Sequence, residues 1–212
     1  MEAKSSDKIP DIVIGRLPLY LRALTRLHTQ GKDVTSSHEL GRRLDISSAQ
    51  IRKDLSHFGG FGKQGTGYQI DFLIEKLREV LQLNREWQVA VVGAGNLGRA
   101  IAHYAGFIDR GFKISWVFDA DPEKIGTQTD QIIIQAIDEM AQIIKDNHVQ
   151  IAMLAVPAEH AQSVTNILVD SGIRAILNYA PINVNVPEHV HVQYIDPVIH
   201  IQHMTYYLDD SE

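Results

Sequence analysis

The spacing of apolar residues changes near residue 86. Before that point, apolar side chains recur every three or four positions, the period of amphipathic helices. The helices expected there span about residues 17–30, 36–44, 47–58 and 71–83. Farther along, apolar runs predict strands at 88–92, 113–118, 132–134, 151–156, 175–177 and 190–194, and the intervening helices at 96–109, 138–147, 158–171 and 197–208. Strands that alternate with helices favour a parallel sheet, so we expect a helical front domain followed by an α/β domain.

Two short helices in the front half are joined by a tight turn. Ser36 and Ser47 each stand three residues before a Glu or Gln, which is the pattern of a capping box. The pair describes a helix-turn-helix whose second helix would enter the major groove, and the glycine-rich segment 59–68 suits a hairpin wing along the DNA backbone. The residues expected on DNA are Ser47, Ser48, Gln50, Arg52, Lys53, Phe61, Lys63 and Tyr68. The same pattern also fits an ordinary three-helix module for protein contact.

A glycine fingerprint follows the first strand of the back half. The strand 88–92 runs into Gly93-Ala94-Gly95-Asn96-Leu97-Gly98, and Asp119 ends the next strand. In a dinucleotide-binding unit, the first glycine permits the turn, the second lets the backbone approach the pyrophosphate, and the third lets the helix pack on the strand. Asp119 would accept hydrogen bonds from the adenosine ribose and repel a 2′-phosphate, which favours NAD(H) over NADP(H). A second G-x-G-x-x-G at Gly60–Gly65 has no such flanks, and we reject it.

The ends of two later strands are placed to form a floor for the nicotinamide. They are Ala155-Val156-Pro157 and Asn178-Tyr179-Ala180-Pro181, and both are mostly apolar. Since an apolar pocket penalises the positive ring of NAD⁺, it would favour NADH. His160 is the best candidate for an acid or base, although a single His at a strand end is more often a polar cap. No metal site is expected.

Charge divides the chain at the same place as the hydrophobic period. Residues 1–85 carry 14 Lys and Arg against 10 Asp and Glu, a net charge of +4, whereas residues 86–212 carry 6 against 16, a net charge of −10. The basic half is therefore the one expected to meet a polyanion. The absence of Cys excludes disulfides and thiol catalysis. Without a signal-like start or an apolar run of about 18 residues, we expect a cytoplasmic protein with no membrane partner.

Several runs of residues together resemble the Rex family of redox-sensing repressors. In the front half these are Arg16-Leu17-Pro18-Leu19-Tyr20, the run from Ser48 to Gly59, Phe61-Gly62-Lys63 and Gly65 to Tyr68. In the back half they are the glycine fingerprint, Phe118 to Gly126 (which includes Lys124), Val156-Pro157-Ala158 and Gly172 to Pro181. The resemblance covers nearly the whole chain in order, and the recognition-helix and wing run is specific to that family.

The resemblance implies a homodimer with three parts in each chain. A winged helix-turn-helix domain at 1–85 would bind an inverted-repeat operator, a Rossmann domain at 86–196 would bind NADH or NAD⁺, and a final helix at 197–212 would be exchanged between subunits. NADH binding would release the DNA. Lys124 would join the cofactor site, and Arg16, Tyr104 and Asp196 would form a switch: Tyr104 bonds the partner's Asp196 in one state, and Arg16 takes it in the other. Pro197 departs from the Leu or Phe that the family often has.

Two other functions are compatible with the sequence. An NAD-dependent oxidoreductase with an accessory front domain would turn over NADH, with His160 as its acid or base. A nucleotide-binding scaffold whose front domain contacts protein would bind DNA without the steep salt dependence that phosphate contacts cause.

Overall fold

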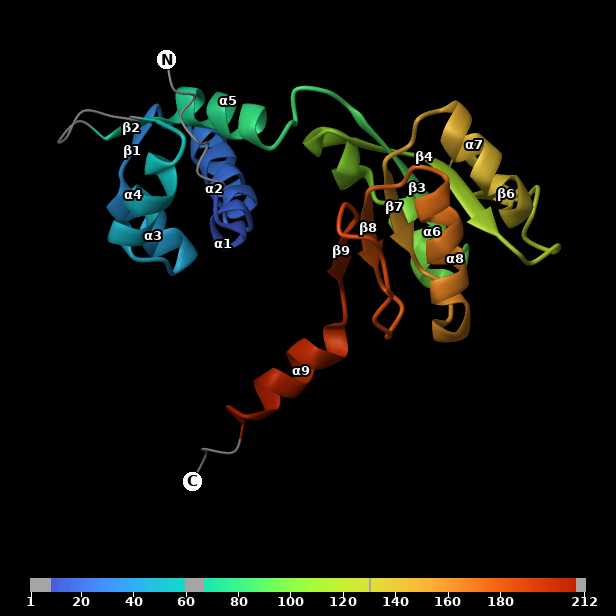
Figure 1. Cartoon of the computed structure of the whole chain (residues 1–212). Helices are drawn as coiled ribbons and strands as arrows, with labels where there is room; N and C mark the ends of the chain where they lie inside the picture. The colour runs from blue at the N-terminus through green and yellow to red at the C-terminus, as the bar shows by residue number, and fades with distance from the viewer. Residues whose placement is uncertain (1–8, 60–66, 130, 209–212) are drawn as a thin grey trace, which may run out of the picture. The chain divides into compact units, whose positions relative to one another are not determined.

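A computed structural model describes residues 9–59, 67–129 and 131–208 (Figure 1). The chain forms two compact units, Met1–Arg85 and Glu86–Glu212, each with its own core. Within the described ranges, no helix is long and apolar enough to cross a membrane.

The first unit is mostly helical. Its elements are α1 (Asp11–Ile14), α2 (Leu17–Thr29), β1 (Val34–Thr35), α3 (Ser37–Leu44), α4 (Ser48–Ser56), β2 (Tyr68–Gln69) and α5 (Ile70–Val80). Their core includes fully buried side chains from α2, α3, α4 and α5: Leu17, Tyr20, Leu24, Leu40, Ile51 and Leu73. The strands β1 and β2 pair antiparallel, with Thr35 opposite Tyr68.

The helix-turn-helix forms where the caps predicted it. Ser36 Oγ accepts from the Glu39 N–H and Ser47 Oγ from the Gln50 N–H, both at 3.1 Å. Between the helices, Asp45 adopts the left-handed conformation (φ 55°), and a Cβ at Gly41 would collide with the carbonyl oxygen of Ile46. The turn can be tight because position 41 has no side chain.

Neither cap is a complete capping box. The second half of the box needs the Glu or Gln side chain to return to the cap N–H. Glu39 instead binds Lys32 and Thr35, and Gln50 binds Asp54. The Glu39 carboxylate and the Gln50 amide therefore bind other side chains and not the N–H of the cap residue.

The second unit is a seven-stranded sheet in the order β5-β6-β4-β3-β7-β8-β9. Its elements in chain order are β3 (Trp87–Val92), α6 (Asn96–Ala102), η1 (Ala105–Arg110), β4 (Phe112–Asp119), β5 (Gln128–Thr129), β6 (Ile132–Ala136), η2 (Ile137–Glu139), α7 (Met140–Asp146), β7 (Ile151–Leu154), α8 (Ala158–Asp170), β8 (Ala175–Asn178), β9 (His191–Tyr194) and α9 (Pro197–Thr205). All neighbouring strands are parallel except β5, which pairs antiparallel with β6.

The two faces of the sheet are covered by different helices, as a doubly wound sheet requires. Ala90 and Val92 belong to a buried cluster with residues of α7 and α8. Their neighbours Val89 and Val91 point the other way, into a cluster that contains Ile101 of α6. The strand order reverses between β3 and β7, and ligands of such sheets bind at the carboxyl ends of the strands beside this point.

In the second unit, the structure corrects three of the predictions made from the sequence. The helix expected at 96–109 ends at Ala102, and a 3-10 helix follows from Ala105. The helix expected at 138–147 likewise begins as a 3-10 turn. The prediction of a parallel sheet is wrong at one edge, because the two-residue strand β5 pairs antiparallel with β6. Such short pieces carry too few residues for a periodic signal.

The last helix, α9, buries no side chain. Pro197 occupies its first turn and Asp196 caps it by accepting from the Val198 N–H at 2.9 Å. Large apolar side chains remain exposed along it and just beyond: Val198, Ile199, Ile201, Met204, Tyr206, Tyr207 and Leu208. Several large apolar side chains exposed on one short segment are typical of an interaction site.

Candidate nucleotide site and recognition helix

The glycine turn after β3 is shaped by close backbone contacts. Gly93 has a φ of 99°, and a Cβ there would overlap the carbonyl oxygen of Ala155 on the neighbouring strand. A Cβ at Gly98 would overlap the carbonyl oxygen of Gly93, so this glycine lets α6 pack on the turn. Gly95 differs from both, because an added Cβ would meet no protein atom within 4 Å. Its open side leaves room for a ligand to reach the backbone.

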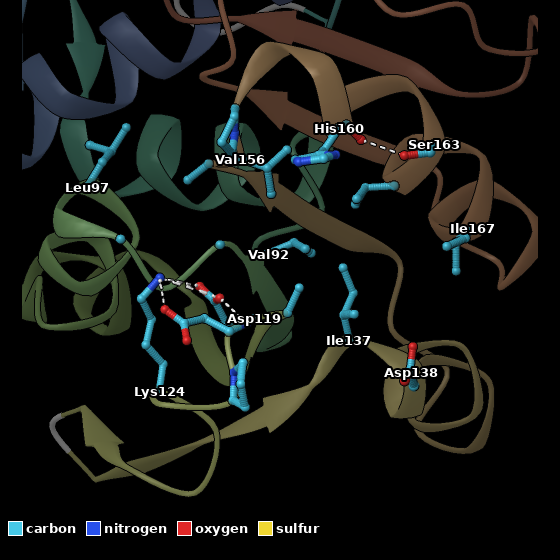
Figure 2. A pocket seen from close by; sticks show the side chains of 18 of the residues that line it. Val92, Leu97, Asp119, Lys124, Ile137, Asp138, Val156, His160, Ser163 and Ile167 are labelled. Carbon is cyan, nitrogen blue, oxygen red and sulfur yellow. Dashed lines mark hydrogen bonds and ion pairs between the residues drawn. The ribbon is translucent and has the colours of Figure 1, made fainter.

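A cavity of about 1150 Å³ opens at this turn, beside the carboxyl ends of β3, β4 and β7 (Figure 2). Gly93, Gly95, Asn96 and Leu97 line it, together with Asp119 and Lys124. The end of β7 contributes Ala155, Val156 and Pro157. No side chain caps the first turn of α6, so its N–H groups remain to meet an anion. The volume exceeds that of most drug-sized pockets and suits a dinucleotide.

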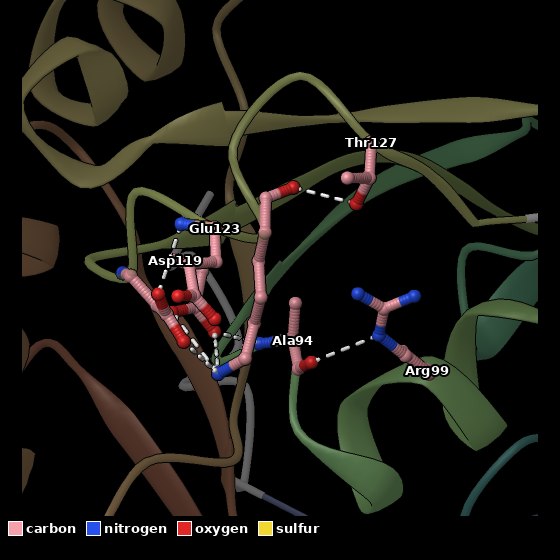
Figure 3. Close-up of polar contacts among 7 residues, drawn as sticks. Ala94, Arg99, Asp119, Glu123 and Thr127 are labelled. Atoms are coloured by element: carbon pink, nitrogen blue, oxygen red, sulfur yellow. Dashed lines mark hydrogen bonds and ion pairs between the residues drawn. The ribbon is translucent and has the colours of Figure 1, made fainter.

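Asp119 closes the turn from the end of β4 (Figure 3). Its carboxylate accepts from the N–H groups of Ala94 at 2.6 Å and Asp121 at 2.8 Å. The Lys124 ammonium lies 3.4 Å from Asp119 and 3.3 Å from Asp121. Burial favours the neutral acid, but these hydrogen bonds and the ammonium outweigh it, so the pKa of Asp119 lies below its ordinary value. Asp119 is therefore an ionised acceptor in the cavity at neutral pH.

The recognition helix α4 presents a polar face. Arg52 and Lys53 are exposed, Ser48 is half-buried, and Ser47 caps the helix. The Arg52 guanidinium donates to Ser37 Oγ at 3.1 Å, which holds it beside the start of α3. Tyr68 lies in β2 and is half-buried. Phe61 and Lys63 lie outside the described residues.

One acidic residue of α4, Asp54, is buried. Asp54 is 0% exposed, and its carboxylate accepts from Arg16, Tyr20 and Gln50. Burial again opposes ionisation, but the three donors together hold the pKa of Asp54 below its ordinary value. Gln50 is one of the residues expected on DNA, and in the structure its amide also donates to this buried acid at 2.7 Å.

Comparison with known proteins covers both units. A model described as a putative DNA-binding protein N-terminus matches residues 8–56, and one described as a CoA binding domain matches residues 84–182. A curated protein of Roseiflexus sp. (strain RS-1), the redox-sensing transcriptional repressor Rex, is 52% identical over 94% of this chain and 90% of its own. The chain belongs to the Rex family.

Two solved structures of the Rex-family repressor RSP are similar to the whole chain. One, in complex with β-NAD⁺ and operator DNA, has a TM-score of 0.91 at 34% identity and covers 96% of this chain and 94% of its own. The other, in complex with β-NADH, has a TM-score of 0.86 at 31% identity and covers 95% of each chain. The fold class expected from the sequence, a helical DNA-binding domain followed by a Rossmann domain, is therefore confirmed. Most of the predicted wing, residues 60–66, lies outside the described residues.

Of the two runs predicted to form the nicotinamide floor, one lines this cavity and the other does not. Ala155, Val156 and Pro157 line it, but Asn178, Tyr179, Ala180 and Pro181 are not among its lining residues. Asn178 is fully buried, accepts from the Ala180 N–H and donates to the Ile182 carbonyl, each at 2.9 Å. In this chain Asn178 shapes the turn after β8, and a nicotinamide role for this run stays a prediction.

The predicted switch residues of this Rex chain have separate surroundings. Tyr104 is 52% exposed, and its ring lies over Gly106 and edge-on to Phe107. Asp196 caps α9. Arg16 is 20% exposed and binds Asp54 through Nε and Nη2, while no described residue accepts from its Nη1. The free edge of the guanidinium could therefore receive a second carboxylate.

Sequence reasoning singled out His160 but missed the rest of one wall of the cavity. His160, Ser163, Val164 and Ile167 line it from α8, opposite Asp119 and Lys124 (Figure 2). Their spacing of three, four and seven residues is that of one helix face, which was the available signal. Other lining residues that the fingerprint did not indicate are Ala120, Asp121, Pro122, Ile137, Asp138 and Ala141.

Proposed function

We propose that this chain is a redox-sensing transcriptional repressor that binds operator DNA and is released from it by NADH. The observation that carries the proposal is the presence, in one Rex-family chain, of a recognition helix with exposed cations and a dinucleotide-sized cavity with an ionised acid. The ligands named for the RSP structures, NADH, NAD⁺ and operator DNA, match these two features.

The cavity residues suit NAD(H) in distinct roles. The open face of Gly95 and the first turn of α6 would receive the pyrophosphate, while Asp119 accepts from the adenosine ribose hydroxyls. Two carboxylates, Asp119 and Asp121, already share the Lys124 ammonium, so a 2′-phosphate would meet net negative charge. The apolar Val156 and Pro157 favour a neutral ring. NADH, when bound, supplies a neutral nicotinamide where NAD⁺ supplies a cation.

The apolar surface of α9 supports a homodimer in which this helix packs on the partner subunit. Alone it buries nothing, so its exposed side chains need a second chain to leave water. The partner's Asp196 would then bond Tyr104 in one state and the free edge of Arg16 in the other. The two recognition helices would read two half-sites about one helical turn of DNA apart, or a multiple of that distance.

Asp119→Ala is expected to weaken NADH binding about 10- to 150-fold, because a hydrogen bond to a charged group contributes about 1.5–3 kcal/mol. Operator affinity without nucleotide should stay at the wild-type value, since the described hydrogen bonds and ion pair of Asp119 all lie within the second unit. The measurement is a titration followed by NADH fluorescence, with the exposed acid Glu123→Ala as the matched control. An unchanged NADH affinity would exclude the ribose role.

Arg52→Ala is expected to weaken operator binding by about 1–3 kcal/mol and to relax sequence preference at one position, as removal of a base-reading Arg does. The exposed Arg22→Ala on α2 is the matched control for a lost positive charge. Affinities measured over a series of salt concentrations also test DNA binding itself, because phosphate neutralisation gives a steep log–log slope. Weaker binding with unchanged selectivity would make Arg52 a phosphate contact.

The position of His160 on the cavity wall keeps an oxidoreductase as the second candidate. That function requires NADH consumption with a carbonyl substrate, lost in His160→Ala. We propose no catalytic role, because the His160 imidazole has no carboxylate partner among the described residues. The hydrogen bonds of His160 there are made by its backbone, whose N–H donates to the Pro157 carbonyl and whose carbonyl accepts from Ser163.

A further inference from the structure

The buried carboxylate of Asp54 has every acceptor position filled. Its Oδ2 accepts from Arg16 Nε at 2.6 Å and from the Tyr20 hydroxyl at 2.5 Å. Its Oδ1 accepts from Arg16 Nη2 at 2.8 Å and from Gln50 Nε2 at 2.7 Å. An ionised carboxylate offers about four lone-pair sites, so these four donors saturate it.

This contact decides which way the Gln50 amide points. An ionised carboxylate only accepts hydrogen bonds, so the Gln50 atom that faces Asp54 must be the NH₂ group. One N–H is thereby held, while Oε1 and the second N–H of Gln50 have no partner among the described residues. The half-buried Gln50 therefore presents an acceptor and a donor in a fixed order.

In the major groove, that pair of atoms matches one base edge. Adenine offers its N7 acceptor beside the N6 amino donor, and a glutamine amide reads both at once. If the amide were free to turn over, it would present the opposite order as often and lose this discrimination.

We propose that Asp54 is a positioning residue for base recognition, which fixes Gln50 as a reader of adenine in each operator half-site. The proposal deepens the repressor function and rests on it. Arg16 and Tyr20 tie the same carboxylate to α2, across 38 and 34 residues of sequence. The reading amide is thus held by the body of the first unit as well as by its own helix.

The test is a comparison of base discrimination among full-length variants. A duplex site is first selected from a random library with the wild-type protein, and each base pair is then replaced in turn. For the wild type we expect one A·T pair per half-site whose replacement weakens binding about 5- to 150-fold, the equivalent of 1–3 kcal/mol. Gln50→Met should reduce the ratio at that pair to about one and leave the other pairs unchanged.

Asp54→Asn should also reduce the affinity ratio at the same A·T pair to about one. Asparagine offers one oxygen where the carboxylate offers two, and its NH₂ group allows the Gln50 amide to turn over. Tyr20→Phe is the matched control, because it removes a donor from Oδ2 and leaves the Gln50 contact at Oδ1 intact. This control should keep the wild-type ratio at the A·T pair even if its stability falls.

Four results would overturn the proposal. Two are full base discrimination in Asp54→Asn and unchanged affinity ratios in Gln50→Met. The other two are a loss of discrimination at a pair that is not A·T, and the same loss of discrimination in Tyr20→Phe. None of these removes the repressor function, whereas a wild-type protein that selects no site would. If Asp54→Asn does not fold, the side-chain amide protons of wild-type Gln50 decide by NMR. We expect one of them shifted downfield and protected from exchange; two water-exposed protons would contradict the contact.

Discussion

Replacing Arg16 by Met is expected to destabilise the first unit by about 3–5 kcal/mol, because removal of one partner leaves a buried charge uncompensated. Asp54 would keep only the Tyr20 hydroxyl and the Gln50 amide as donors. Since a domain has about 5–15 kcal/mol in total, the loss is a large share of its stability. Hydrogen exchange of the α2 and α4 amides reports it directly.

The same variant should have a distinctive pH dependence. In the wild type the folded pKa of Asp54 is lowered, so its contribution is present above the unfolded value of about 4 and is lost as the pH falls through the folded pKa. Without the guanidinium, burial is expected to dominate and to raise the pKa of Asp54. The variant should therefore lose the most stability at neutral pH, where the buried carboxylate would be charged. The difference between the two proteins should therefore shrink toward pH 4. An equal difference at both pH values would contradict the account.

The matched control for this prediction is Arg22→Met, an exposed cation on α2, the helix that begins directly after Arg16. It should change stability by no more than about 0.5 kcal/mol, as surface substitutions do. A similar loss in both variants would show that charge on α2, and not the contact with Asp54, sets the stability.

Gly98→Ala is expected to abolish measurable NADH binding. The new Cβ would overlap the carbonyl oxygen of Gly93, so α6 must move away from the turn whose backbone faces the cavity. Losing two hydrogen bonds to a charged group, at about 1.5 kcal/mol each, already weakens binding by more than about 100-fold. The displaced helix should also cost about 1–3 kcal/mol of stability, the usual cost of overpacking.

Gly95→Ala separates binding from folding. An added Cβ at Gly95 meets no protein atom within 4 Å, so the thermal stability should match the wild type. The methyl group would still occupy the space through which the pyrophosphate approaches the backbone, and NADH binding should fall. Wild-type NADH affinity in both variants would refute the glycine roles; equal loss of stability in both would refute the packing argument.

The parts of the fold that the sequence predicted carry strong local signals. The caps at Ser36 and Ser47 marked the start of both helices of the helix-turn-helix, and the glycine fingerprint with Asp119 marked the first parallel pair of strands. These signals work because a cap or a tight turn satisfies backbone groups within a few residues.

What the sequence did not predict depends on contacts between distant residues. Asp54 has no local signal that separates it from the other polar residues of α4. It is nevertheless buried and accepts four hydrogen bonds, three from Arg16 and Tyr20 at the start of α2 and one from Gln50. The break of the helix after Ala102 has no Pro or Gly at the break itself. The α8 wall of the cavity arises because β7 brings that helix over the carboxyl ends of the strands.

The central claim is that NADH and operator DNA oppose each other on this protein. The measurement is the fluorescence anisotropy of a labelled inverted-repeat duplex bound to the full-length protein at fixed salt, titrated with NADH and separately with NAD⁺. We expect release by NADH and not by NAD⁺, with the operator affinity lowered about 5- to 150-fold, the usual range of coupling between two sites. Tight binding that is indifferent to both nucleotides would contradict the account.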